Sequence, residues 1–144
     1  MLIFTVHGTN AADLSDDGEQ WWQKGSEFQK KLQSRISEPL HFFPFHWSGN
    51  NSEFERRGAA LELLKHFETV ENEGIPYGAI AHSHGGNVIA DALRFSQIEF
   101  PAGGVSFDSE VKTKEPNLQN LHFWFTVGTP FINPIRSFFL LRMS

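Results

Sequence analysis

Residues 77–95, YGAIAHSHGGNVIADALRF, pass from a short apolar run to a helical pattern within a few positions. The run Tyr77–Ala81 predicts a strand. The stretch Asn87–Phe95 predicts a helix, because its apolar side chains recur on one helical face. Those side chains are Val88, Ile89, Ala92 and Leu93. The segment thus predicts a strand that turns directly into a helix, which is typical of a parallel α/β sheet.

Ser83 stands at that turn, with small residues two positions before and two after it. Ala81 and Gly85 leave room for the backbone to fold tightly beneath the serine. The arrangement is typical of a nucleophile elbow, a sharp turn that exposes a serine hydroxyl. The alternative interpretation is a serine in an ordinary strand-to-helix turn.

The amino-terminal segment also predicts a strand of a parallel α/β sheet. Leu2–Val6 is a short, apolar and β-branched run, and it ends in residues 7–10, HGTN. This pattern predicts a strand followed by a glycine turn.

A strand ending in His-Gly and a later strand followed by His-Ser-His-Gly-Gly together resemble the α/β-hydrolase superfamily, on its lipase and esterase side. Residues 45–50, FHWSGN, and 125–130, FTVGTP, also resemble strand ends of lipase-like members. The resemblance extends from Leu2 to about Ile132 and covers the front part of the family's fold.

The resemblance implies a serine hydrolase acting on carboxylic esters, with a small-molecule or lipid ester as substrate. Ser83 would be the nucleophile, and the backbone N–H groups of Thr9 and His84 would form the oxyanion hole. Gly8, Gly85 and Gly86 would support the turn. We expect no cofactor, because the sequence has neither a glycine-rich phosphate loop nor a metal-ligand spacing.

The acid and histidine that complete such a site usually follow the nucleophile on later loops. Downstream of the serine, the candidate bases are His84 and His122, and the aspartates are Asp91 and Asp108. His122 falls in a predicted strand and so is poorly placed to act as the base. Asp91 falls on a predicted helix, where we expect it to be solvated or to bind an arginine. Asp108 is the only aspartate in a loop after the serine and is a weak candidate for the acid. The sequence therefore also permits an idle, truncated hydrolase or a partner-binding domain.

The remaining histidines near the turn have structural interpretations. We expect His82 to pack beside the strand end, the imidazole of His84 to line the pocket, and His7 to be structural or pocket-lining. A zinc site formed by these three histidines is not favoured, because no carboxylate has a suitable spacing.

Composition narrows the function class. The chain has 144 residues and a formal net charge of -5, which argues against nucleic acid as a partner. Its basic pairs, Lys30-Lys31 and Arg56-Arg57, lie on helical patterns with acidic neighbours. The lack of cysteine is compatible with a reducing compartment. With neither a signal peptide nor a transmembrane segment visible, we expect a cytoplasmic protein.

The rest of the chain predicts an α/β fold with about four parallel strands, ordered second, first, third, fourth, with helices on both faces and one domain over 1–144. The resemblance implies that this domain is a partial α/β-hydrolase fold. A helix is expected from about Trp21 to Ile36, with Phe28, Leu32 and Ile36 on one face. Leu40–Trp47 is expected to be an edge strand because it contains Pro44.

Ser52 and Glu55 form a capping box that starts a helix ending at Gly74, and its repeating apolar residues are Phe54, Leu61, Leu64 and Phe67. Residues 101–120 predict a long loop, and Leu121–Val127 predict the last strand. That strand would be an open sheet edge, which invites self-association.

Overall fold

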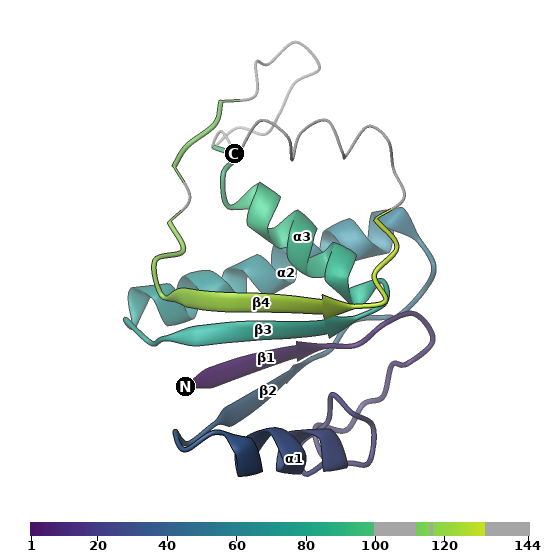
Figure 1. Cartoon of the computed structure of the whole chain (residues 1–144). Coiled ribbons are helices and arrows are strands. Elements are labelled where there is room, and N and C mark those ends of the chain that lie inside the picture. The colour runs from purple at the N-terminus through teal and green to yellow at the C-terminus, as the bar shows by residue number, and fades with distance from the viewer. Residues whose placement is uncertain (100–111, 116, 132–144) are drawn as a thin grey trace.

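A computed structural model describes residues 1–99, 112–115 and 117–131, and it confirms the α/β class. The sheet has four parallel strands in the predicted order β2-β1-β3-β4 (Figure 1). The strands are β1 (Leu2–Val6), β2 (His41–Phe45), β3 (Tyr77–His82) and β4 (Leu121–Val127). The helices are α1 (Glu27–Arg35), α2 (Glu53–Asn72) and α3 (Gly85–Phe95).

The helices divide between the two faces of the sheet, with α2 and α3 together on one side and α1 on the other (Figure 1). The main core lies under α2 and α3. Phe4 and Val6 of β1 meet Leu63 and Phe67 of α2 and Val88 of α3 in this core. Burial of these large apolar side chains stabilises the positions of β1 and β3. The His-Gly-Thr segment follows β1, and the turn that contains Ser83 follows β3.

The first helix is shorter than predicted. Residues 21–25 are not helical but form turns, a bend and an isolated bridge of Lys24 with Asp17, and α1 begins only after Ser26, whose side chain accepts a hydrogen bond from the N–H of Gln29. Gly25 has a φ of 81°, which ends any helical path through this stretch. The expected apolar face is only partly buried: Phe28 is exposed, Leu32 and Ile36 are half-buried, and the buried residue of α1 is Gln29.

The capping box of α2 is confirmed, because the Ser52 side chain accepts a hydrogen bond from the N–H of Glu55. The predicted apolar stripe is wrong at its amino-terminal end, where Phe54 is 86% exposed and Leu61 40%. The buried face is set instead by small and apolar residues further along: Ala59, Ala60, Leu63, Leu64, Phe67 and Val70. Gly74, with a φ of 67°, follows the end of the helix as predicted.

The strand boundaries agree with the sequence to within two residues. β2 is an edge strand, and Pro44 pairs with Thr5 of β1. β4 forms the other edge of the described sheet. Most of the predicted loop 101–120 lies outside the described residues; in the part described, Thr113 forms an antiparallel bridge with Ile98. Over the described ranges, no helix has the length and apolarity needed to cross a membrane.

Candidate active site

Ser83 occupies the turn between β3 and α3 in a left-handed conformation, with a φ of 53°. Positive φ is uncommon for residues other than glycine and is kept only where the surrounding structure enforces it. The N–H of Ser83 donates to the carbonyl of Val127 at 2.8 Å, and its own carbonyl accepts from the N–H of Gly86 at 3.0 Å. These bonds hold the serine at the carboxyl edge of the sheet.

The loop after β4 also forms hydrogen bonds with the turn that contains Ser83 and with the start of α3. The hydroxyl of Thr129 donates to the Ser83 carbonyl at 2.9 Å, and the side-chain amide of Asn87 donates to the carbonyl of Pro130 at 3.4 Å. The sequence alone indicates only a strand end at residues 125–130. Its Thr-Pro pair turns out to be a direct support of the serine turn.

Three glycines allow the backbone to close around Ser83. A Cβ on Gly8 would lie 2.9 Å from the Ser83 Cβ, so the loop after β1 passes directly beside the serine. A Cβ on Gly85 would come within 2.5 Å of the His7 carbonyl oxygen. A Cβ on Gly86 would overlap the Thr129 side chain. Side chains at these positions are sterically excluded, which accounts for the glycines that flank the motif.

The loop after β1 is fixed on both sides of Thr9. The indole Nε1–H of Trp47 donates to the His7 carbonyl at 2.9 Å, and the N–H of Asn10 donates to the Gly49 carbonyl at 2.9 Å. The N–H groups of Thr9 and His84 have no acceptor among the described residues. Two backbone donors thus stay unused next to Ser83, as an oxyanion site requires.

Several side-chain atoms around these motifs are buried without a hydrogen-bond partner in the described part of the chain. They are His7 Nε2, Thr9 Oγ1 and His84 Nδ1. Buried polar atoms are normally satisfied by protein groups or by ordered water. Tyr77 Oη, at the amino end of β3, is a further such atom. The three atoms in the segments that follow β1 and β3 make this edge of the sheet suited to a polar ligand or water.

His7 is fully buried between two tryptophans. Its ring stacks on Trp47 at 5.5 Å and lies 4.8 Å from Trp22. Burial lowers the pKa of His7, although the Gly8 carbonyl, 2.9 Å from Nδ1, opposes the shift. A ring enclosed in this way supports the loop after β1 and does not reach a substrate.

His82 and His84 differ in their surroundings. His82 is exposed, and its ring lies edge-on to Trp21 at 6.5 Å. His84 is partly buried, and burial together with the charge of Arg56 lowers its pKa. The two imidazoles beside Ser83 are therefore in different environments.

The other candidates lie away from the serine or outside the described residues. Asp91 is buried, and its carboxylate forms an ion pair with Arg94 at 3.1 Å. The predicted contact with an arginine is confirmed, and the alternative of a solvated side chain is wrong. His122 is the second residue of β4, near the opposite end of the strand from Val127. Asp108 falls outside the described residues. No group of three or more potential metal ligands occurs in the described ranges.

Comparisons of the chain with protein-family models, with curated proteins and with solved structures found no match.

Sequence reasoning missed one polar cluster on the α1 side. His46 contacts the Asp13 carbonyl through Nδ1 at 2.9 Å and the Asp16 carboxylate through Nε2 at 2.5 Å. The side chains of His46 and Asp16 line a pocket of about 320 Å³, which Lys24 and His66 line as well. The only signal in the sequence was the acidic character of the loop after β1, which does not identify a partner 30 residues away.

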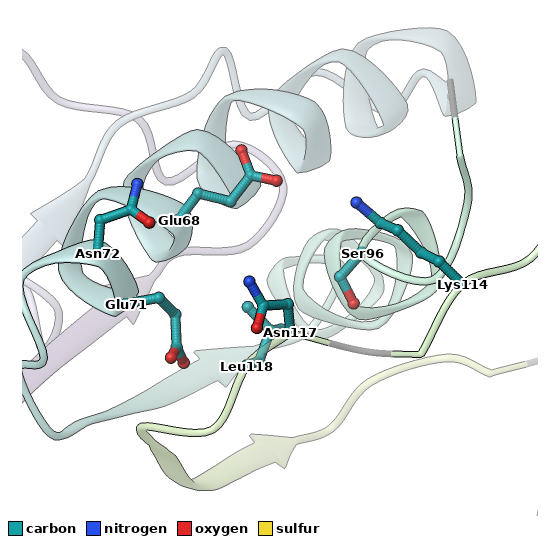
Figure 2. A pocket seen from close by; sticks show the side chains of 7 residues that line it. All are labelled: Glu68, Glu71, Asn72, Ser96, Lys114, Asn117 and Leu118. Carbon is teal, nitrogen blue, oxygen red and sulfur yellow. The ribbon is translucent and has the colours of Figure 1, made fainter. Parts of the chain in front are cut away.

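A second pocket, of about 200 Å³, lies between the carboxyl-terminal ends of α2 and α3 (Figure 2). Glu68, Glu71 and Asn72 of α2 face Ser96 and Lys114 across it (Figure 2). Neither pocket is lined by Ser83, Thr9 or His84.

Proposed function

We propose that the protein is a serine hydrolase that acts on carboxylic esters, with Ser83 as its nucleophile. The observation that carries the proposal is the left-handed backbone of Ser83, with a φ of 53°, at a turn between a parallel strand and a helix. Strain of this kind at a non-glycine residue clusters at functional sites. An ordinary turn would place glycine or asparagine in this conformation.

The neighbourhood of the serine supports the same chemistry. Attack of the hydroxyl on an ester carbonyl moves negative charge onto the carbonyl oxygen, and donors must already face that position. The unused N–H groups of Thr9 and His84 come from two loops that meet beside Ser83, and the Thr9 loop is fixed by Trp47 and Gly49. Charge stabilisation by such donors is usually a large part of acyl-transfer catalysis.

The sequence resemblance to α/β hydrolases adds the substrate class. In that family the residue after the nucleophile and the loop after an earlier strand supply the oxyanion donors. His84 and Thr9 occupy those positions, and the close approach of Gly8 to Ser83 is consistent with them. A small-molecule or lipid ester would be attacked by Ser83, and water would release the acid from the acyl-enzyme.

The test is covalent labelling by a fluorophosphonate, measured as intact mass on the full chain. The parent protein is expected to gain one probe, with fluoride as the leaving group, and Ser83→Ala is expected to gain none. Circular dichroism of both proteins establishes that they are folded. A folded parent that stays unlabelled, and that hydrolyses a short activated ester no faster than Ser83→Ala, would contradict the proposal and favour an idle or partner-binding domain.

A further inference from the structure

We infer that the loop of residues 10–20 is held against the end of β2 by the protonated form of His46 and loosens when that imidazole loses its proton. The loop begins directly after Thr9 and leads from β1 toward α1. His46 is the first residue after β2 and contacts the loop at two points. This response to pH does not depend on whether Ser83 is a nucleophile.

Both ring nitrogens of His46 face oxygen acceptors of the loop. Nδ1 lies 2.9 Å from the Asp13 carbonyl oxygen, and Nε2 lies 2.5 Å from Oδ1 of Asp16. A neutral imidazole has one N–H group and one lone pair, so it donates one of these hydrogen bonds and turns its lone pair toward the other oxygen. The imidazolium ion donates both. The observed arrangement therefore fits the charged ring.

Asp16 supplies the negative charge that complements this ring. The hydrogen bond from His46 lowers the pKa of Asp16, and the ammonium group of Lys24, 3.7 Å from the other carboxylate oxygen, lowers it as well. The carboxylate is thus ionised across about pH 5 to 8, the interval in which imidazoles titrate. Of the two partners in the ion pair, His46 is the one whose charge changes over that interval.

The other titratable groups around His46 have different surroundings. The Trp22 ring lies 5.3 Å from His46 and 4.8 Å from His7. Burial lowers the pKa of His7, and the charge of His46 lowers it further, so His7 resists protonation when His46 is charged. His66 of α2 lines the same pocket, and the Asp13 carboxylate accepts an N–H from within the loop at 3.0 Å. Among the described residues, it is the His46 ring whose nitrogens face both loop oxygens.

The loop has few other attachments to the rest of the protein. The N–H of Lys24 donates to the Asp16 carbonyl at 2.7 Å, which closes the loop on itself. Within the described ranges, the hydrogen bonds that residues 11–19 form with segments outside 10–24 both go to His46. Loss of one of them on deprotonation therefore removes half of these attachments, close to the proposed oxyanion donor at the start of the loop.

The experiment follows amide hydrogen exchange of residues 10–20 by mass spectrometry at about pH 5.5 and about pH 8, on either side of the ordinary histidine titration. Protection is the exchange rate of an unstructured peptide of the same sequence divided by the measured rate, so the chemical effect of pH cancels. The full-length parent is compared with His46→Gln. Exposed ion pairs contribute modestly to stability, so the parent loop should be about two- to fivefold better protected at the lower pH and nearly equal at the higher one.

His66→Gln is the matched control, because it removes another histidine that lines the same pocket. Its loop should follow the parent at both pH values. Circular dichroism at each pH establishes that every protein is folded. Equal protection of the parent and His46→Gln at the lower pH would overturn the inference, and so would loss of the pH response in His66→Gln.

Asp16→Asn separates charge from packing. The amide of this variant can donate to Nε2 of a neutral imidazole while Nδ1 still donates to the Asp13 carbonyl. Protection of its loop should therefore no longer fall between the two pH values. The 15N shifts of the His46 ring in the parent should show two protonated nitrogens at the lower pH. An undiminished pH response in Asp16→Asn, or a neutral His46 ring in a fully protected parent loop, would overturn the inference.

Discussion

Gly85, the first residue of α3, lies so close to the end of β1 that a Cβ on it would come within 2.5 Å of the His7 carbonyl oxygen. The carbonyl of Val6 is also in its way. The obstacle is backbone on a central strand, which cannot rotate aside as a side chain can. The start of α3 can therefore pack against the end of β1 only because residue 85 has no Cβ.

Gly85→Ala should therefore destabilise the fold by about 3 kcal/mol, since overpacking against backbone forces a shift of α3 or β1. Gly58→Ala is the matched control: Gly58 is an exposed glycine in α2 with open space at its Cβ position. That variant should gain about 0.5–1 kcal/mol from helix propensity. Urea denaturation measures both, and equal midpoints for Gly85→Ala and the parent would contradict the predicted clash.

Ser83→Gly should be more stable than Ser83→Ala by about 1 kcal/mol, because only glycine adopts the φ of 53° without steric cost. Both variants lose the hydroxyl, so the comparison isolates backbone strain from chemistry. The measurement is again urea denaturation, with fluorophosphonate labelling expected to be absent in both. If the alanine variant proved the more stable of the two, the turn would not be strained.

Acidification should destabilise the protein through His7. Burial holds the pKa of His7 below its ordinary value, so between these two pKa values the unfolded chain binds more protons than the folded one. The contribution is complete above the ordinary histidine pKa of about 6.5 and is lost as pH falls toward the folded pKa. Urea midpoints of the parent should fall between about pH 7.5 and 5.

His7→Asn removes this titration and keeps a side-chain donor for the Gly8 carbonyl. Its midpoint should fall less over the same interval than that of the parent. Some dependence should remain, because the pKa of His84 is lowered as well. An equally steep fall in His7→Asn would show that other groups control the acid response.

Glu71→Ala should destabilise the fold by about 1–3 kcal/mol, because it leaves donors of Asn120 without their acceptor. The Glu71 carboxylate accepts the backbone N–H of Asn120 at 2.9 and 3.1 Å and its side-chain amide at 2.9 Å, just before β4 begins. Glu68→Ala, one turn earlier on α2, makes the same chemical change at a residue whose side chain forms no hydrogen bond or ion pair with another described residue. It should stay within about 0.5 kcal/mol of the parent, and similar losses in the two variants would contradict the role of Asn120.

The sheet could be predicted from the sequence because each strand is a compact apolar run with clear turn residues after it. The order also followed, since Pro44 requires an edge position and the two motifs require neighbouring strands. The failures lie in the helices. Apolar spacing suggested burial for Phe54 and Leu61, but burial depends on which face of α2 meets the sheet, and that is a tertiary property.

The candidate site shows the same division. The glycines around Ser83 and the two loops were readable as local motifs, and the structure brings Gly8 and Ser83 together. The supports supplied by Trp47 and Thr129 were not, because each joins segments about 40 residues apart or more. Such contacts leave no periodic trace in one sequence.

The position of β1 at the centre of the sheet has a consequence for biosynthesis. Leu2 pairs with His41 on one side and with Tyr77 on the other, so both edges of β1 are paired only after residues far along the chain have been synthesised. Until then LIFTV, residues 2–6, is an uncharged segment of high β-propensity that can pair with other nascent chains. The yield of folded protein should therefore fall with the speed and density of expression and rise when translation is slowed.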